Sequence, residues 1–331
     1  MPAVILDGTE IAREIVAGLQ PRIAELKAGR RPLRLVVIRA NDNPGSASYA
    51  RATESWCAEN GVGFFLENCG AAASERQILE AILRHGADAA TTGIMLHMPL
   101  PEGVRQEVLV TAIDPAKDVE GMHPFNLGRL LFGESRPGPC TAMGAVELAR
   151  RAVGELAGKT AVVLGRSPIV GRPAALLLTA LSATVTVAHT RTRDLAGVCR
   201  SADILIAATG GLQAAWAKHR AALDAFKAGT GAKPVFGGLP AVVTADMVKP
   251  GAAVIDVGVN RVPAGFDPDG EPVRDPASGK IVFETRGDVD FEGVRGVAGV
   301  LTAPKGGTGA MTNAMLLGNL VWAAGVGRKG G

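Results

Sequence analysis

Aromatic residues are scarce in this chain of 331 residues, making up 4% of it, and Tyr49 is the only tyrosine. Because 47% of the residues are nevertheless hydrophobic, we expect mainly Ala, Val, Leu and Ile to fill the cores. The length suits two domains of ordinary size. Net charge is also small, at +3, and no basic stretch is interleaved with aromatic residues. This argues against a nucleic-acid-binding surface.

Cysteine is rare and scattered. No C-x-x-C pair occurs among Cys57, Cys69, Cys140 and Cys199, which argues against a disulfide framework or a zinc site, so no metal is expected. The sequence also lacks an uncharged stretch long enough to span a bilayer. Residues 1–15 lack the basic start and long apolar run of a signal peptide. We therefore expect a soluble protein of the reducing cytoplasm that contacts no membrane.

The first 142 residues alternate helix patterns with strand patterns. Apolar residues recur at helical spacing from Ile11 to Lys27, and Leu33 to Ile38 is a run of the kind that is buried on both faces of a sheet. The alternation continues with helices expected at 48–60 and 74–84 and strands expected at 62–66 and 93–98. This rhythm predicts a parallel α/β sheet.

The same rhythm begins again near residue 143. Helices are expected at 143–154 and up to residue 180, and strands at 160–164, 183–187, 204–208 and 253–257. Two irregular stretches, about 213–238 and 263–280, are interpreted as insertions in surface loops. An apolar helix expected over 312–324 needs a second surface to bury against, which predicts that it returns to the first domain. The expected fold is α/β with two domains, residues 1–142 with 300–331 and residues 143–299.

One segment, TAVVLGRSPIVGRPAALLL (160–178), has the parts of a dinucleotide-binding loop. The expected strand ends at Gly165, and Gly171 follows six residues later at the start of a helix. Glycines let the backbone approach a pyrophosphate, and the N-terminus of the helix supplies free N–H groups and positive potential. The spacing differs from G-x-G-x-x-G, so a tight turn in an unrelated doubly wound domain is the alternative interpretation.

The end of the next expected strand favours NADP over NAD. NAD-type sites place an Asp or Glu there to hold the ribose hydroxyls. This strand instead ends in His189, Thr190 and Arg191, and the first acid after it is Asp194. Together with Arg166 of the loop, these cations and hydroxyls suit a 2′-phosphate. The alternative is that the arginines are solvated surface charges, and NAD stays possible.

Six segments match a known enzyme family in order and spacing. They are DNPGSASY (42–49), GIMLHMPLP (93–101), KDVEGMHPFNLGRL (117–130), GRSPIVGRP (165–173), IDVGVNR (255–261) and APKGGTGAMT (303–312). Apart from the two insertions, the chain resembles methylenetetrahydrofolate dehydrogenase/methenyltetrahydrofolate cyclohydrolase over nearly its whole length.

The resemblance implies an N-terminal catalytic, folate-binding domain completed by the C-terminal helix, a Rossmann-type NADP domain, a folate cleft between them, and a homodimer. It implies oxidation of 5,10-methylenetetrahydrofolate to the 5,10-methenyl cation by hydride transfer to NADP, after which many members hydrolyse that cation to 10-formyltetrahydrofolate. Hydride transfer mainly requires that the two reactants be aligned. Hydrolysis also requires that a water be activated and a proton be moved.

The matching motifs also imply two sets of binding residues. The folate set comprises Tyr49, which corresponds to the family's stacking residue for the pterin, together with His97, Pro99, Glu120, Lys305, Gly306, Gly307 and Thr312. The cofactor set comprises Gly165, Arg166, Ser167, Val170, Gly171, His189, Thr190, Arg191, Thr209, Gly210, Asp256 and Gly258. The catalytic positions implied are Tyr49, Thr53, His97 and Glu120.

One departure from the family bears on the chemistry. The family's Y-x-x-x-K pattern reads Tyr49-Ala50-Arg51-Ala52-Thr53 in this chain. Four residues make about one helical turn, so Tyr49 and Thr53 share a face. The resemblance implies that the lysine carries the proton transfers of hydrolysis, and a threonine hydroxyl has no accessible pKa near neutrality. We therefore expect cyclohydrolase activity to be lost or very weak.

Three further departures lie in the same motifs. His97 replaces the usual glutamine, and is interpreted either as a hydrogen-bonded wall residue or as a titrating group that partly rescues hydrolysis. Glu120 replaces the usual aspartate, whose carboxylate is expected to hold the amino and ring N–H groups of the pterin. Lys305 replaces an apolar residue, and either supplies a cation or points to solvent. Asp118 is expected to order its loop rather than to react.

Two other functions stay open from the sequence. A second enzyme hypothesis changes the substrate to another reduced pterin, such as methylenetetrahydromethanopterin, because several altered positions are expected in one pocket. A third hypothesis is a folate- or nucleotide-binding protein without turnover, although an intact dinucleotide loop argues against it.

Overall fold

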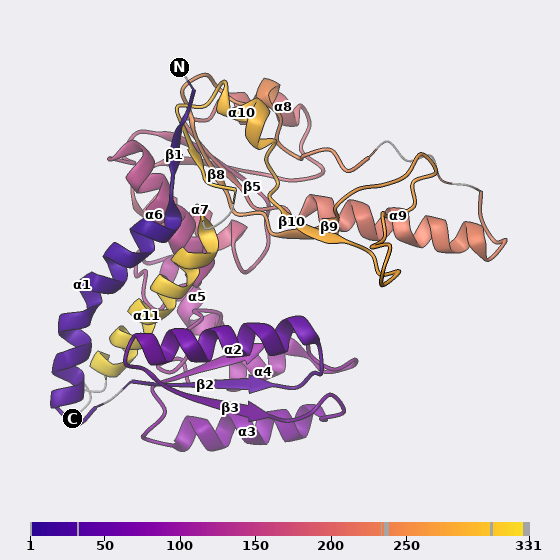
Figure 1. The fold of residues 1–331 in the computed structure, drawn as a ribbon. Helices are drawn as coiled ribbons and strands as arrows, with labels where there is room; N and C mark the ends of the chain where they lie inside the picture. The colour runs from indigo at the N-terminus through magenta and orange to yellow at the C-terminus, as the bar shows by residue number, and fades with distance from the viewer. Residues whose placement is uncertain (1, 32, 233, 235–237, 305–306, 327–331) are drawn as a thin grey trace. The chain divides into compact units, whose positions relative to one another are not determined.

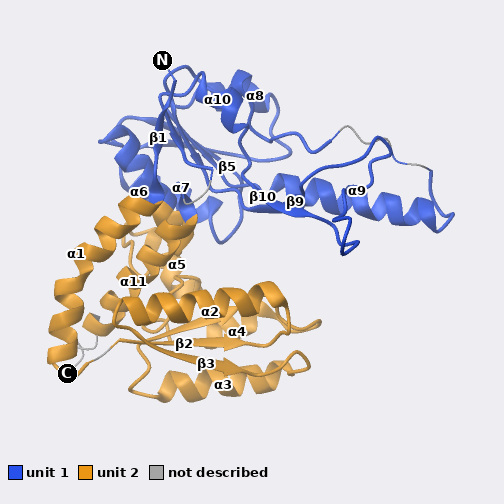
Figure 2. Cartoon of the chain, in the orientation of Figure 1, with its two compact units in different colours: residues 1–8, 145–308 blue, residues 9–144, 309–331 orange. Residues whose placement is uncertain are grey.

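The computed structural model describes residues 2–31, 33–232, 234, 238–304 and 307–326, and Figure 1 follows the chain through its elements. Two compact units divide it: unit 1 contains residues 1–8 and 145–308, and unit 2 contains residues 9–144 and 309–331 (Figure 2). The expected boundaries placed residues 1–8 and 300–308 with the other part of the chain. They belong to unit 1 because β1 (Val4–Leu6) pairs in parallel with β11 (Val300–Thr302).

Unit 2 is built on a three-stranded parallel sheet in the order β3-β2-β4. Its strands are β2 (Arg34–Arg39), β3 (Gly63–Asn68) and β4 (Gly93–His97). Residues 35–38 of the central strand are fully buried. The apolar run recognised in the sequence is therefore a central strand covered on both faces, as predicted.

Within the described residues, unit 2 contains the helices expected at 11–27, 48–60 and 74–84, and two short helices that the sequence pattern did not predict. They are α1 (Gly8–Ala28), α2 (Pro44–Glu59), α3 (Glu75–Ala87), α4 (Gln106–Ala112) and α5 (Pro124–Leu130), while α6 (Cys140–Val153) crosses the boundary into unit 1. Apolar residues on one face of α3, Ile78 and Ile82 among them, share a core with Val36, Ile38 and Ile94 of the sheet. A capping box at Ser74 starts this helix.

The last helix, α11 (Thr308–Val326), rejoins unit 2, which confirms the prediction that it returns to the first part of the chain. Asn319 on this helix is fully buried. Its amide nitrogen donates to the backbone oxygens of Val119 and Gly138, both at 2.9 Å. Among the described residues, no helix is both long and apolar enough to cross a membrane.

Unit 1 contains a six-stranded parallel sheet in the order β1-β11-β8-β7-β5-β6. The inner strands are β5 (Thr160–Leu164), β6 (Thr184–Ala188), β7 (Ile204–Ala207) and β8 (Ala253–Asp256), and the connecting helices include α7 (Gly171–Ala180), α8 (Leu195–Arg200) and α10 (Phe291–Arg295). The chain runs from β5 to β6 on one side and then crosses to β7 on the other. Ligands of doubly wound sheets bind at such a reversal, beyond the carboxyl ends of the strands.

One interpretation of the sequence is wrong. Most of the stretch expected to be an irregular loop at 213–238 is helical, because α9 covers Gly211–Lys227. Leu212, Trp216 and Leu223 recur on its buried face, and Trp216 packs on Phe266 of the second insertion, with ring centroids 5.6 Å apart. The hairpin of β9 (Asn260–Pro263) and β10 (Phe283–Arg286) completes this accessory region.

Candidate active site

The start of α2 positions the only tyrosine. Asn43 caps the helix by accepting hydrogen bonds from the backbone N–H groups of Gly45 and Ser46, and Pro44 occupies the first turn, where a missing N–H costs nothing. Tyr49 follows on this helix with 45% of its surface exposed. Its ring stacks on that of His97, with centroids 5.0 Å apart and planes inclined by 28°.

Thr53 lies one helical turn after Tyr49 and is only 4% exposed. Its Oγ1 donates a hydrogen bond to the backbone oxygen of Tyr49 at 2.9 Å, a bond that Ser and Thr commonly form to the preceding turn of a helix. The hydroxyl proton is therefore committed to the helix backbone.

His97 ends β4 and is 4% exposed. Neither of its ring nitrogens finds a hydrogen-bond partner among the described residues. Burial lowers the pKa of this imidazole to about 4, and the charge of Arg39, which lies opposite on β2, acts in the same direction. His97 is therefore neutral at physiological pH. Buried polar atoms are rarely left without a partner, so these nitrogens are suited to hydrogen bonding with a ligand.

Glu120 is brought beside His97 by a segment that runs along β4. The backbone N–H of Ile94 donates to the oxygen of Lys117 at 2.8 Å, and Glu120 Oε2 accepts from the N–H of Leu96 at 3.1 Å. Burial raises the pKa of the Glu120 carboxyl to about 7; the Leu96 hydrogen bond opposes this rise, and the charge of Asp118 adds to it.

Asp118 itself is buried and orders the loop, as expected. Its Oδ2 accepts from the backbone N–H of His123 at 2.7 Å and from the amide of Asn126 at 2.9 Å. These bonds fix the turn that leads from Glu120 into α5.

For the other residues expected to bind folate, the structure gives fewer contacts. The backbone oxygen of Pro99 accepts from the amide of Asn41 at 2.8 Å, and Thr312 Oγ1 lies 3.3 Å from Thr141 Oγ1. Gly307 belongs to unit 1. Lys305 and Gly306 lie outside the described residues. The structure thus gathers Tyr49, Thr53, His97 and Glu120 in unit 2, at and beyond the end of β4.

In unit 1, a side chain at either glycine of the expected dinucleotide loop would collide with the backbone. Gly165 has φ +125°, and a Cβ on it would lie 2.2 Å from the backbone oxygen of Ala208. A Cβ on Gly171 would lie 2.2 Å from the backbone oxygen of Gly165. Ser167 Oγ accepts from the N–H groups of Val170 at 3.1 Å and Gly171 at 3.3 Å. The loop is therefore folded tightly against the start of α7.

The end of β6 carries no free carboxylate in the structure. His189 Nδ1 accepts from the N–H of Arg191 at 3.1 Å, which forms a turn that leaves Thr190 and Arg191 exposed. The first acid, Asp194, caps α8 by accepting from the N–H of Gly197 at 3.0 Å. Arg166 is exposed as well. The position that would receive an adenosine ribose therefore offers cations and hydroxyls.

Two aspartates, the buried Asp288 and the partly buried Asp256, brace the loops beyond β7 and β8. Asp288 Oδ2 accepts from the N–H groups of Thr209 at 2.6 Å and Gly210 at 3.2 Å. Asp256 accepts from the N–H groups of Gly258 at 2.9 Å and Asp288 at 3.0 Å. Burial raises the pKa of Asp256 to about 6. In this structure the Asp256 carboxylate holds backbone, and the cofactor contact expected of it stays a prediction.

Models of one protein family match both parts of the chain. The catalytic domain of tetrahydrofolate dehydrogenase/cyclohydrolase matches residues 6–120, and its NAD(P)-binding domain matches residues 139–222 and 235–327. The chain belongs to the tetrahydrofolate dehydrogenase/cyclohydrolase family. It is 39% identical over 324 residues to the bifunctional protein FolD of Cereibacter sphaeroides, covering 98% of this chain and 95% of that one.

Solved structures of the same family agree with the fold. The bifunctional FolD dehydrogenase/cyclohydrolase of Campylobacter jejuni superposes with a TM-score of 0.79 at 32% identity, covering 98% of this chain and 99% of that chain. FolD of Trypanosoma brucei, solved with NADP and an inhibitor, gives 0.80 at 30% identity and covers 99% of both chains. The α/β architecture and the family resemblance expected from the sequence are thereby confirmed.

Sequence reasoning missed three polar residues of these family domains. Arg39 ends β2 opposite His97, and its buried Nε has no partner among the described residues. Asn41 holds Pro99, and Asp288 holds the loop after β7. Polar residues directly after buried strands were a usable signal for Arg39 and Asn41, because parallel strands end at one edge of the sheet. Asp288 is distant in sequence from the residues it holds and carried no such signal.

Proposed function

We propose that this protein oxidises 5,10-methylenetetrahydrofolate to 5,10-methenyltetrahydrofolate with NADP, and that it hydrolyses the methenyl product very weakly or not at all. Membership of the family over both domains supports the oxidation. The observation that carries the second part is Thr53: the side chain at the family's lysine position is buried, uncharged and bonded to the Tyr49 backbone.

The residues of unit 1 fit NADP. Gly165 and Gly171 keep the loop free of side chains that would block the approach of a pyrophosphate, and the N-terminus of α7 follows directly. Arg166 and Arg191 are exposed for charge-assisted bonds to a 2′-phosphate, and Asp194 is engaged in capping. When bound, the nicotinamide supplies the acceptor for the hydride.

The residues of unit 2 fit a reduced pterin. The Tyr49 ring is exposed enough to stack on a planar ligand while it rests on His97. The Glu120 carboxylate has lone pairs beyond the one that Leu96 occupies, and these accept from the amino and ring N–H groups of a pterin. The neutral His97 ring offers one donor and one acceptor.

Among the described residues of this site, Tyr49 and His97 are poor proton carriers for the hydrolytic step. General acid–base catalysis near neutrality requires a group whose pKa lies near the working pH. Burial raises the pKa of Tyr49 to about 12, and burial lowers that of His97 to about 4. Glu120, with its pKa near 7, is the remaining titrating group, and its ionised form is needed to hold the pterin. The lowered pKa of His97 weighs against its rescue of hydrolysis.

An assay of purified protein with methylene- and methenyltetrahydrofolate, each with NADP and with NAD, tests the proposal. We expect NADP reduction with the methylene substrate and little opening of the methenyl compound beyond its uncatalysed rate. Methylenetetrahydromethanopterin serves as the second donor and is expected to react more slowly. Hydrolysis at a rate comparable with oxidation would show that the chain is bifunctional.

A homodimer of cytoplasmic location completes the proposal. The homodimer rests on the family resemblance, and the described side chains add one supporting feature to it. Leu131 and Phe132, just after α5, are 70% and 85% exposed, and these adjacent apolar side chains are available for a contact between subunits. The cytoplasmic location rests on the scattered cysteines of the sequence.

A further inference from the structure

A cavity lies in unit 2 at the end of its sheet opposite to Tyr49 and His97. It has a volume of about 760 Å³ and is lined where β2 and β3 begin, at Arg34 and Gly63. His97, in contrast, stands where β4 ends. The cavity is therefore separated from the proposed pterin site by the length of the strands, and none of its lining residues belongs to that site.

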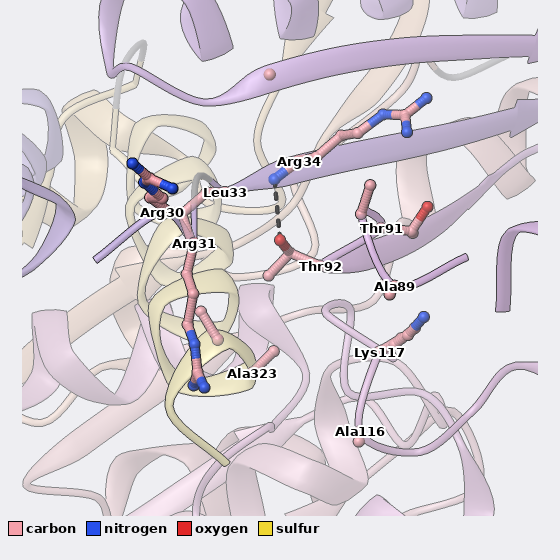
Figure 3. A pocket seen from close by; sticks show the side chains of 13 residues that line it. Arg30, Arg31, Leu33, Arg34, Ala89, Thr91, Thr92, Ala116, Lys117 and Ala323 are labelled. Atoms are coloured by element: carbon pink, nitrogen blue, oxygen red, sulfur yellow. Dashed lines mark hydrogen bonds between the residues drawn. The ribbon is translucent and has the colours of Figure 1, made fainter. Parts of the chain in front are cut away.

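The lining of this cavity is basic on more than one side. Arg30 and Arg31 follow α1 and lie beside α11, whereas Lys117 and Thr91 approach from the other side (Figure 3). Arg34 adds a further cation, and no Asp or Glu is among the lining residues. Cavities of roughly 300–1,000 Å³ hold small organic molecules.

Two of these cations, Lys117 and Arg34, already form contacts within the protein. Lys117 Nζ donates to the backbone oxygens of Gly86 at 2.6 Å and Asp88 at 2.8 Å, where it neutralises the C-terminal end of α3. Arg34 forms an ion pair with Asp88 at 3.1 Å. These two contacts are structural and would exist without any ligand.

Arg30 and Arg31, unlike Lys117 and Arg34, are not engaged in such contacts within the described ranges. Both are exposed, and within the described ranges neither forms an ion pair. Thr92 lies between them and Lys117 in the view of Figure 3. Its Oγ1 accepts from the backbone N–H of Arg34 at 3.0 Å, which leaves the hydroxyl hydrogen able to donate. The lining thus contributes one hydroxyl donor and two guanidinium groups without an ion pair among the described residues, and these two extend in opposite directions in Figure 3.

We propose that this cavity binds a small organic anion whose phosphate or carboxylate oxygens pair with Arg30 and Arg31. Guanidinium groups bind both kinds of oxyanion through paired N–H donors. The carbon part of the ligand would pack against the apolar side of the lining, formed by Leu33, Ala323 and Ala324. This site goes beyond the proposed oxidation, because none of its residues takes part in hydride transfer.

Calorimetric titration of the full chain with inorganic pyrophosphate and, separately, with citrate tests this site. Saturating NADP is present throughout, so that the dinucleotide loop of unit 1 is not available to either anion. We expect one saturable site per chain. Tighter binding of pyrophosphate indicates a phosphorylated natural ligand, and tighter binding of citrate indicates a polycarboxylate.

Substitutions locate the binding. Arg30→Ala and Arg31→Ala are each expected to weaken the anion about tenfold, the effect of losing one charge-assisted bond. Arg13→Ala removes an exposed arginine of α1 that does not line the cavity, and it should leave binding unchanged. Unchanged dehydrogenase rates in all three variants show that they are folded. Absence of saturable binding at millimolar anion, or equal binding by the three variants, would overturn the proposal whether or not the oxidation is confirmed.

Discussion

At residue 53, a side chain of three heavy atoms stands where the family places a lysine. The Thr53 hydroxyl donates to the Tyr49 oxygen and is buried, so it neither titrates nor extends from the helix. The proposed loss of hydrolysis concerns one step of the chemistry only. Hydride transfer depends on the placement of the two reactants, whereas hydrolysis depends on a group that takes up and returns a proton.

Thr53→Lys is the substitution that tests this residue. We expect it to raise the rate of methenyltetrahydrofolate opening by at least about tenfold, at the low end of what general acid–base catalysis contributes. The measurement is the loss of methenyl absorbance in the absence of NADP. Thr53→Val keeps the shape of the side chain without its hydroxyl, and should change neither activity appreciably. If the lysine variant behaves like the valine variant, the pocket has diverged beyond this one position.

Glu120 predicts the pH dependence of the oxidation. Burial raises the pKa of its carboxyl to about 7, and the ionised form is the one proposed to accept from the pterin. We therefore expect kcat/KM for methylenetetrahydrofolate to fall about tenfold per unit as the pH drops below this pKa. Glu120→Gln should be slow and lack this dependence. A wild-type profile that is flat from pH ~5.5 to ~8 would contradict the role given to this carboxylate.

The same raised pKa predicts that the stability of the fold decreases as the pH rises, whereas the activity increases. A carboxyl whose pKa is higher in the folded chain than in the unfolded chain favours folding when protonated, and this stabilisation is lost as the pH rises through about 7. Glu120→Gln mimics the protonated form. Its Tm should exceed that of the wild type near pH ~8 by a few degrees and match it near pH ~5, as measured by calorimetry.

At the scale of elements, the turn from β5 to α7 depends on the absence of two side chains. Gly165→Ala places a Cβ 2.2 Å from the Ala208 oxygen at a residue with φ +125°. We expect it to abolish measurable NADP binding in calorimetry, because the loop must shift to relieve the contact. Gly18→Ala, on α1 with open space around it, is the matched control and should bind NADP normally. Normal NADP affinity in Gly165→Ala would mean that the cofactor binds elsewhere.

The loop after β8 gives a second prediction at this scale. Asp256 accepts from the N–H groups of Gly258, Asp288 and Val289. Asp256→Asn turns one acceptor into a donor that faces N–H groups, so we expect a loss of about 1–3 kcal/mol in unfolding free energy. Chemical denaturation measures it. The KM for NADP should rise as the loops after β7 and β8 loosen, while the KM for the folate stays constant.

At the scale of the whole molecule, the chain forms two compact units that each have their own sheet. The proposed homodimer predicts a mass of twice the 33.9 kDa of the chain in sedimentation equilibrium. Phe132→Glu tests whether the exposed apolar residues after α5 contribute to it. A mass of one chain at micromolar concentration would remove the dimer from the proposal.

Much of the architecture was accessible from local pattern. Buried parallel strands are continuous apolar runs, so β2, β4 and β5 were recognisable within a residue or two. The sequence pattern did not reveal the helix α9, because its large apolar residues are few. Leu212, Trp216 and Leu223 form its buried face and are separated by alanines and charged residues. Its apolar partner Phe266 lies in the second insertion, more than forty residues on, and no local pattern links the two.

The sequence by itself determined the alternation of strands and helices, the tight glycine turn, the cationic end of β6 and the replacement of lysine by Thr53. These follow from neighbouring residues, since propensity, periodicity and side-chain chemistry act locally. Only the tertiary structure decided that His97 is neutral and that its ring nitrogens have no hydrogen-bond partner in the described part of the chain, that burial raises the pKa of Glu120 to about 7, and that Asp256 braces backbone. A pKa and a hydrogen bond depend on burial and on partners distant in sequence, and folding alone brings those together.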